Sequence, residues 1–343
     1  MKEPKKILVV RTDRLGDVIL STPVIKNLRL AYPSSFIAFM CRPYTKDVLL
    51  GNPYLDEVII YDKYGRHRSV VSSLRFAFSL SKKKFDLALI LHPTNRVHMI
   101  TFFARIPMRF GWNRKMGVLL THRLPHTKQD GFKHEMEYTL DILRLAGIPV
   151  VERTLFFPVR EEARKRVAVL LREKGLSDND KFFVIHPSAS CPSKRWPISY
   201  FGKLVDMIKN TFDKPILVIS SKEERRFCDE LFKGRLYLVD LRGELNIGQL
   251  GALLEKAELL ISNDSGPVHI AASLGTPVIS IFGRNDAGLS PRRWRPLGSR
   301  AFYIHKDVGC NPCLAHNCRK GFLCLKAVGV EEVFSLVRRI LEK

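Results

Sequence analysis

Residues 263–283, NDSGPVHIAASLGTPVISIFG, decide the fold, because they place a carboxylate, a hydroxyl, a glycine and a histidine around one strand-to-helix turn. The preceding apolar run, AELLIS, is short enough for a buried parallel strand. Ser265, Gly266 and Pro267 then open a helix that continues through Leu274. A second apolar run, TPVISIFG, follows this helix. The stretch therefore predicts a strand, a helix and a strand, the repeating unit of a parallel α/β sheet.

The turn inside this unit is a candidate site for a diphosphate. Backbone N–H groups at the start of a helix attract anions, and the ligands of parallel sheets bind beyond the carboxyl ends of the strands. We expect Ser265 and Gly266 to donate their N–H groups to a phosphate, and Asp264 to orient backbone and sugar contacts. For His269, ligand contact and neutral packing within the helix are equally good interpretations.

The composition is that of a folded protein with two cores. The chain has 343 residues, of which 45% are hydrophobic, and it contains no low-complexity tract. Such a length suits two domains. Residues 1–10, MKEPKKILVV, run directly into a strand pattern without the apolar region of a signal peptide, and no run of about 18 uncharged apolar residues occurs. We therefore expect a cytoplasmic protein.

Both halves of the chain alternate short apolar runs with helical segments. In the first half, the strand-like KKILVV precedes the turn RTDRLGD and the helical pattern VILSTPVIKNLRLAY, and SSFIAFMC, DEVIIYD and FDLALILHP predict further strands. The second half predicts strands at FFVIHPSAS, PILVIS, LYLVDL, LLISND and VISIFG, with helices at SYFGKLVDMIKNTF and IGQLGALLEKA. Each half is expected to form a doubly wound parallel sheet.

The charge of the chain is strongly positive and is concentrated in one region. The formal net charge is +23, and residues 61–133 contain fifteen Lys or Arg residues against three acids. Such a protein commonly binds nucleic acid, an anionic membrane or a phosphorylated substrate. Residues 63–85, KYGRHRSVVSSLRFAFSLSKKKF, have the composition of a basic amphipathic helix. A solvated helix covering a core is an equal alternative.

Four of the seven cysteines form a pattern near the end of the chain. Cys310, Cys313, Cys318 and Cys324 are spaced C-x2-C-x4-C-x5-C. Four thiolates suit a structural zinc ion in a cytosolic protein, where thiols stay reduced. Reduced thiols, or disulfides formed after lysis, are the alternative interpretation, and an iron–sulfur cluster is less favoured because nothing else indicates electron transfer.

Three blocks together resemble the ADP-heptose:lipopolysaccharide heptosyltransferases, glycosyltransferase family 9. They are VVRTDRLGDVILSTPVIKNLR, HPSASCPSKRWP and NDSGPVHIAASLGTPVISIFG. The blocks follow the family's order and separations, so the resemblance covers nearly the whole chain. The KRWP form of the middle block is most similar to the second heptosyltransferase of the pathway.

The resemblance implies the GT-B glycosyltransferase architecture, in which two Rossmann-like α/β domains face one cleft. Residues 1–155 would form the acceptor-binding domain and residues 156–325 the nucleotide-sugar-binding domain. A last helix within residues 326–343 would pack back on the first domain. The implied reaction moves heptose, with inversion at its anomeric carbon, from ADP-L-glycero-D-manno-heptose to the lipid A-Kdo-heptose inner core of lipopolysaccharide.

The resemblance also assigns two catalytic residues. Asp17 follows Gly16 at the turn after the first predicted strand, the position of the family's catalytic aspartate, where it would deprotonate the acceptor hydroxyl. On spacing alone, a helix-capping role is equally good, since Asp favours that position. Lys194 matches the family's phosphate-binding lysine and would stabilise the departing ADP. Asp13, in the same turn as Asp17, is expected to contribute acceptor or loop contacts.

Further donor contacts are expected in the second half. Arg195 would supply another cation for the diphosphate. A surface loop rich in Ser, Pro and Lys would explain the composition around it but not the neighbouring Trp196. Ser188 and Ser190 are candidate hydroxyl donors to the phosphates. Glu223 or Glu224, just past the strand PILVIS, is placed to hold the ADP ribose, as acids after the second strand of such units do.

The implied acceptor explains the basic first half. The growing core is anchored on lipid A at the cytoplasmic face of the inner membrane, and it carries phosphates and Kdo carboxylates. The protein would therefore bind there peripherally, on an anionic surface. The candidates for acceptor and membrane contacts are Asp13, Arg14, Arg66, Arg68, Arg75, Lys82, Lys83 and Lys84.

No catalytic metal is expected, because the chain lacks a DxD or His-rich motif and Lys194 with a helix N-terminus can replace a cation at the diphosphate. Magnesium ions would at most stimulate the transfer reaction. Two other functions remain: a family member that uses another nucleotide sugar and, more distantly, a basic nucleic-acid-binding protein. A nicotinamide dehydrogenase is disfavoured, since the turn RTDRLGD lacks G-x-G-x-x-G.

Overall fold

The computed structural model describes residues 3–342 and divides the chain into two compact units. The first unit extends to Pro158, except that residues 130–132 group with the second unit, which continues from Val159. The division lies close to the boundary expected at residue 155. Each unit contains one six-stranded sheet in which all neighbouring strands are parallel.

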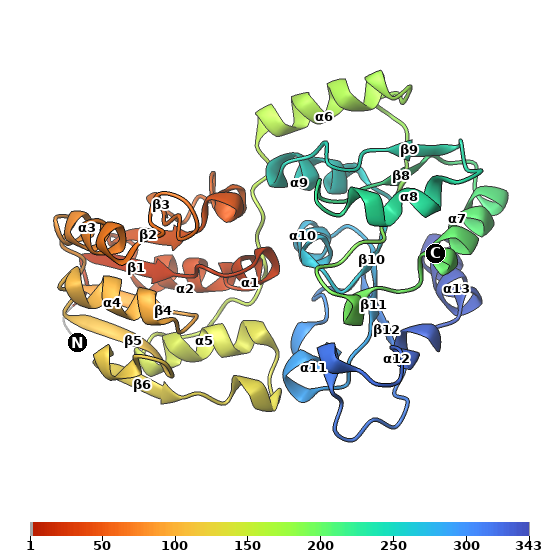
Figure 1. The fold of residues 1–343 in the computed structure, drawn as a ribbon. Helices are drawn as coiled ribbons and strands as arrows, with labels where there is room; N and C mark the ends of the chain where they lie inside the picture. The colour runs from red at the N-terminus through yellow and green to blue at the C-terminus, as the bar shows by residue number, and fades with distance from the viewer. Residues whose placement is uncertain (1–2, 343) are drawn as a thin grey trace. The chain divides into compact units, whose positions relative to one another are not determined.

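The first sheet has the strand order β3-β2-β1-β4-β5-β6 (Figure 1). Its central strands are buried on both faces, as parallel strands between two helical layers must be; from Ile7 to Val10, every β1 side chain is fully buried. The strands are β1 (Lys6–Val10), β2 (Phe36–Cys41), β3 (Glu57–Ile60), β4 (Leu87–Ile90), β5 (Met108–Asn113) and β6 (His122–Pro125).

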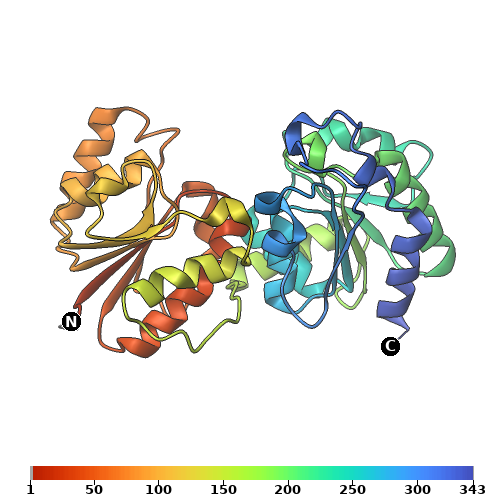
Figure 2. The ribbon, with the colours of Figure 1, turned by 90° about the horizontal axis from the view of Figure 1, so that it is seen from below.

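Helices cover both faces of this sheet. In Figure 2, α3 and α4 lie together on one face, while α2 and α5 lie on the other. The predicted helical run after the first turn is divided into α1 and α2, because Pro23 at the start of α2 lacks the N–H that a continuous helix would use. The helices are α1 (Leu15–Ile19), α2 (Thr22–Ala31), α3 (Val70–Ser81), α4 (Asn95–Phe103) and α5 (Glu135–Leu145).

The second sheet repeats this arrangement with the order β9-β8-β7-β10-β11-β12. Its strands are β7 (Phe183–His186), β8 (Ile216–Val218), β9 (Leu238–Asp240), β10 (Leu259–Asn263), β11 (Val278–Phe282) and β12 (Ala301–His305). Its helices are α6 (Glu161–Glu173), α7 (Ile198–Thr211), α8 (Asp229–Phe232), α9 (Ile247–Lys256), α10 (Gly266–Leu274), α11 (Pro291–Trp294), α12 (Leu323–Lys326) and α13 (Val330–Leu341).

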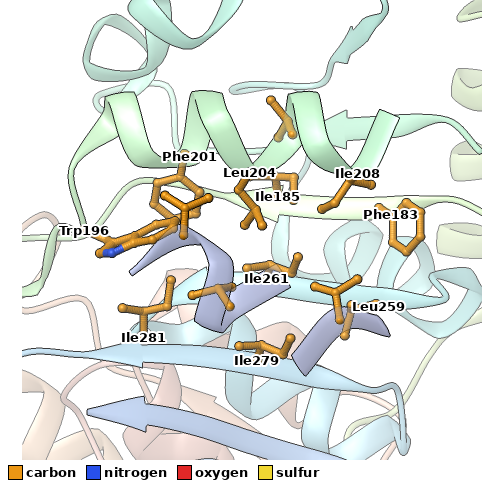
Figure 3. Close-up of a cluster of buried hydrophobic side chains, with 14 of the residues drawn as sticks. Phe183, Ile185, Trp196, Phe201, Leu204, Ile208, Leu259, Ile261, Ile279 and Ile281 are labelled. Atoms are coloured by element: carbon orange, nitrogen blue, oxygen red, sulfur yellow. The ribbon is translucent and has the colours of Figure 1, made fainter. Parts of the chain in front are cut away.

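One face of the second sheet carries the core drawn in Figure 3. Phe201, Leu204 and Ile208 of α7 point onto the strand side chains, among them Ile185 and Ile261. The same cluster includes buried residues of α13, which packs against α7. The last helix therefore belongs to the second unit, and its expected packing back on the first domain stays a prediction. The sequence predicts an apolar face on this helix but not that the face packs against α7.

The strands expected from the sequence are present, and three more are found. β5 contains Arg109 and Gly111, and the edge strand β6 is mostly exposed, so neither forms a long apolar run. β12 has the short apolar run AFYI but is only partly buried. Within residues 3–342, none of the helices is both long and apolar enough to cross a bilayer.

Both sheets reverse their strand order at one point, between β1 and β4 in the first and between β7 and β10 in the second. In open parallel sheets, ligands bind outside the carboxyl ends of the strands at such a point. The residues that directly follow these four strands are therefore the first candidates for a functional site in each unit.

The α7 core should contribute strongly to stability. Leu204 is fully buried, so Leu204→Ala should lower the free energy of unfolding by about 2–5 kcal/mol through lost burial and a residual cavity. The matched control is Leu236→Ala, because Leu236 is 100% exposed and the same substitution should change stability by less than about 0.5 kcal/mol. Chemical denaturation followed by circular dichroism measures both; equal effects would contradict this packing.

Candidate active site

A buried cluster of charged side chains lies at the switch point of the first sheet. Arg11 leaves β1 directly and is 1% exposed. Its Nε lies 2.9 Å from Oδ1 of Asp13, and its Nη2 lies 2.6 Å from Oδ1 of Asp17 and 2.9 Å from Oε1 of Glu135. Lys128 donates to the same Glu135 oxygen at 2.9 Å. Three carboxylates thus share two cations away from water.

This surplus of negative charge changes the protonation of Asp17. Burial raises the pKa of Asp17 to about 6, the carboxylate of Asp13 adds to the rise, and the guanidinium of Arg11 opposes it. His92, which follows β4, lies with Nδ1 3.3 Å from Oδ2 of Asp13. Burial and Arg11 lower the pKa of His92 to about 3, so its ring is neutral near pH 7. Asp17 is therefore an ionised carboxylate with raised basicity, as a general base requires.

The geometry argues against the capping interpretation of Asp17. The N-cap position of α1 is occupied by Arg14, and the Asp17 carboxylate contacts Arg11. Arg11 and His92 could have been found from the sequence, since both directly follow apolar runs. Lys128 and Glu135 could not, because they reach the cluster only through the tertiary fold.

The predicted acceptor and membrane residues lie mostly on the surface of the first unit. Arg14 is exposed, while Lys83 is partly covered and pairs with Glu57 at 2.7 Å. Helix α3 also exposes Val70, Val71 and Phe78, each by more than half. The exposed cations of the segment around α3 are Arg66, Arg68, Arg75, Lys82 and Lys84.

A second charged cluster lies at the switch point of the other sheet. Asp264 follows β10 and is 4% exposed. Its Oδ2 lies 2.9 Å from Nζ of Lys194 and 2.5 Å from Nη2 of Arg284, which follows β11 and its Gly283. Burial would raise the pKa of Asp264, but Lys194 and Arg284 outweigh it, so the pKa is lowered. Two cations against one ionised carboxylate leave a positive charge that can attract an anion.

Helix α10 begins beside this cluster, with Ser265 at its N-cap and Gly266 as its first residue. The positive end of the helix dipole adds to the attraction for a phosphate. His269, 3% exposed, lies near enough to Asp264 to contribute to lowering its pKa. We call Lys194, Asp264, Arg284 and the start of α10 the diphosphate corner.

His186 connects the two strands that border the corner. Its Nδ1 lies 2.9 Å from Oγ of Ser262 and 3.1 Å from Oγ of Ser265, and its Nε2 lies 3.1 Å from Oγ of Ser188. Burial lowers the pKa of His186 to about 4, so the ring is neutral at pH 7. Asn263 adds a second connection by donating to the carbonyl oxygen of Pro187 at 2.7 Å. Because Ser188 is hydrogen-bonded to His186, its buried hydroxyl already has a partner within the protein.

The other predicted donor residues lie around the corner with different partners. Arg195 donates to the carbonyl oxygen of Ala189 at 2.8 Å and lies over the ring of Phe227. Ser190 is exposed. Glu223 is exposed and Glu224 half-buried, both in the segment after β8, which is paired with β7. Their place after the second strand of the sheet agrees with the sequence expectation, and their contact with a ribose stays a prediction.

The four cysteines line one pocket of about 290 Å³ beside Arg284. All four are free thiols. Among residues 3–342, no three potential ligands are placed together so as to hold a metal ion. The structural zinc therefore stays a prediction.

The chain is similar to known proteins along most of its length. The model of glycosyltransferase family 9 (heptosyltransferase) matches residues 73–323. Lipopolysaccharide heptosyltransferase 2 of Salmonella typhimurium is 25% identical over 92% of this chain and 91% of its own length. Lipopolysaccharide heptosyltransferase 3 of Escherichia coli is 28% identical over 95% of each chain.

Two solved structures show the same fold. A family 9 glycosyltransferase from Veillonella parvula superimposes with a TM-score of 0.89 at 25% identity, over 99% of this chain and 98% of that one. ADP-heptose lps heptosyltransferase II of E. coli superimposes with a TM-score of 0.81 at 22% identity, over 98% of both chains. Because the family model matches well over half of the 343-residue chain, the chain belongs to glycosyltransferase family 9, the heptosyltransferases.

Proposed function

We propose that this glycosyltransferase transfers heptose from ADP-L-glycero-D-manno-heptose to the inner core of lipopolysaccharide. The observation that carries the proposal is Asp17, a carboxylate whose pKa is raised to about 6 and whose Oδ1 is held by Arg11 at 2.6 Å. A group of this pKa accepts a proton near neutral pH. An acceptor sugar hydroxyl is the substrate group that needs such a base.

In the proposed reaction, Asp17 takes the proton of the acceptor hydroxyl as its oxygen attacks the anomeric carbon of the heptose. The bond between that carbon and the ADP oxygen breaks, and the electron pair leaves with ADP. One direct displacement inverts the anomeric configuration. A product with retained configuration would contradict the single-base mechanism.

The diphosphate corner would stabilise the leaving group of this reaction, ADP. Negative charge grows on ADP as the glycosidic bond breaks, and preorganised cations stabilise such charge. Lys194 and Arg284 are held by Asp264 within 2.9 Å, so they need little reorganisation when the diphosphate binds. Lys194 would then exchange part of its contact with Asp264 for the phosphate oxygens. The corner therefore accounts for donor binding without a catalytic metal ion.

The identity of the sugar and of the acceptor rests on the relatives. The Salmonella and E. coli relatives are lipopolysaccharide heptosyltransferases 2 and 3, and the E. coli structural relative is an ADP-heptose lps heptosyltransferase II. The similarity to a heptosyltransferase 2 favours a lipid A-Kdo-heptose acceptor. A family member that uses another nucleotide sugar is the remaining candidate, because the corner binds the diphosphate and not the sugar.

We also propose that the surface around α3 binds the anionic membrane that carries the acceptor. Five exposed cations lie on or beside α3, and Val70, Val71 and Phe78 expose apolar surface on the same helix. Basic side chains attract anionic lipids at about 1 kcal/mol each, and apolar side chains enter the headgroup region. This combination favours a membrane over nucleic acid and implies a peripheral protein at the cytoplasmic face of the inner membrane.

Asp17→Asn should lower the turnover number at least about 100-fold while ADP affinity stays unchanged, because only the general base is lost. In the wild type, kcat/KM should rise with pH through about 6, since Asp17 acts in its ionised form. Mass spectrometry of the acceptor and calorimetric titration with ADP measure these quantities. Asp206→Asn, which changes a carboxylate on α7, is the control; full activity in Asp17→Asn would exclude this base.

Lys194→Ala should weaken ADP binding by about 10- to 100-fold, because a charge-assisted contact to the diphosphate is lost. Lys209→Ala, which changes an exposed lysine of α7, is the matched control and should bind ADP as the wild type does.

Transfer by the wild type should persist in EDTA, with at most a modest loss of activity. An unchanged ADP affinity of Lys194→Ala would remove the corner from donor binding, and complete inactivation by EDTA would require a metal.

Replacing Arg66, Arg68, Arg75, Lys82 and Lys84 by glutamine should abolish co-flotation with vesicles that contain anionic lipid, because the electrostatic attraction is lost. The fold and the activity on a soluble, truncated acceptor should persist. The matched control replaces five exposed cations of the second unit by glutamine: Lys165, Arg166, Lys181, Lys203 and Lys209. Equal flotation of both variants would refute this membrane surface.

A further inference from the structure

The segment with the four cysteines, residues 310–324, touches both backbone segments that carry the cations of the diphosphate corner. Sγ of Cys313 accepts the N–H of Asn285 at 3.3 Å and that of Ala315 at 3.4 Å. Burial raises the pKa of the Cys324 thiol, and the backbone N–H of Arg284 beside it opposes that rise. Two adjacent backbone amides after β11 thus lie against two different sulfur atoms.

Arg284 needs such support because its backbone is left-handed, with φ of 59°. This conformation costs a non-glycine residue of order 1 kcal/mol and persists only where surrounding contacts fix it. The orientation of the backbone directs the guanidinium to Asp264, at 2.5 Å. The sulfur contacts therefore act on a cation of the corner through its own main chain.

The cysteine segment also contacts the residue before Lys194. Nδ1 of His316 lies 2.9 Å from Oγ of Ser193. The two loops meet tightly at Gly283, where an added Cβ would lie 2.8 Å from the carbonyl oxygen of Ser193 and 2.9 Å from Cγ of Leu325. A shift of the cysteine segment would therefore be transmitted to both cations.

We propose that residues 310–324 are a positioning element for the diphosphate corner, and that the thiols of Cys313 and Cys324 set the affinity for a nucleoside diphosphate by holding the backbone at residues 284–285. The inference rests on the proposed donor site. Cys313 and Cys324 act through Arg284 and do not touch the reacting atoms. Chemical modification of these thiols would lower donor affinity and leave acceptor recognition unaffected.

The test compares Cys313→Ala with Cys313→Ser by calorimetric titration with ADP. Sulfur is a weak hydrogen-bond acceptor, so loss of its two N–H contacts should weaken ADP binding about fivefold in Cys313→Ala. Serine can accept the same N–H groups and should restore most of the affinity. The KM for the donor should rise with little change in the KM for the acceptor. Asn317→Ala, at an exposed position of the same segment, is the matched control and should behave as the wild type.

Lys194→Ala distinguishes failure of the positioning element from failure of the proposed donor site. If Lys194→Ala loses ADP affinity and Cys313→Ala does not, the positioning element is refuted and the donor site stands. If Lys194→Ala itself binds ADP normally, the proposed donor site fails. Equal weakening by Cys313→Ala and Asn317→Ala would indicate general loosening of the segment and would also refute the specific role of Cys313.

A second measurement uses the wild-type protein and covers the case in which Cys313→Ala does not fold. A thiol held against a backbone N–H is less available to an alkylating reagent, so bound ADP, which needs these contacts in place, should slow alkylation of Cys313 and Cys324 by iodoacetamide. Peptide mass spectrometry follows each cysteine separately, with Cys310 as the internal reference. Identical labelling rates with and without saturating ADP would overturn the inference.

Discussion

The first unit depends on one buried cation. Arg11 lies at the end of β1 and contacts Asp13, Asp17 and Glu135, each within 2.9 Å. Without Arg11, the three carboxylates would be buried with Lys128, on Glu135, as the remaining cation of the cluster, which would cost several kcal/mol or force protonation. Arg11 thus permits an ionised Asp17 in a place where burial raises its pKa to about 6. The basicity of Asp17, on which the proposed mechanism depends, is set by the balance between its burial and the charge of Arg11.

The two units share one sheet topology, but their charged clusters have opposite excess charge. Each sheet reverses its strand order once, and the charged cluster lies where the flanking strands end. The first cluster has an excess of carboxylates and suits proton removal, whereas the second has an excess of cations and suits a diphosphate. Asp264 illustrates the difference, since two cations lower its pKa while burial dominates at Asp17. A proton acceptor and an anion site together are what sugar transfer from a nucleoside diphosphate requires.

The sequence predicts the parts of this arrangement that are local. Apolar runs predict the central strands, and the residues after them include Asp17, Lys194 and Asp264. Edge strands such as β6 were missed because their exposed side chains are polar. Glu135 and Arg284 were missed for different reasons: Glu135 reaches Arg11 only through the tertiary fold, whereas Arg284 directly follows a predicted strand and its position was readable. Packing partners, such as α7 for the last helix, require the three-dimensional structure.

The most direct test of the account is a transfer reaction with the purified protein, ADP-L-glycero-D-manno-heptose and a lipid A-Kdo-heptose acceptor. The account predicts that the acceptor gains the mass of one heptose, that one ADP is released for each product, and that the new bond has the inverted anomeric configuration. Failure with every inner-core acceptor, together with transfer from a different nucleotide sugar, would contradict the proposed donor and leave the family assignment standing.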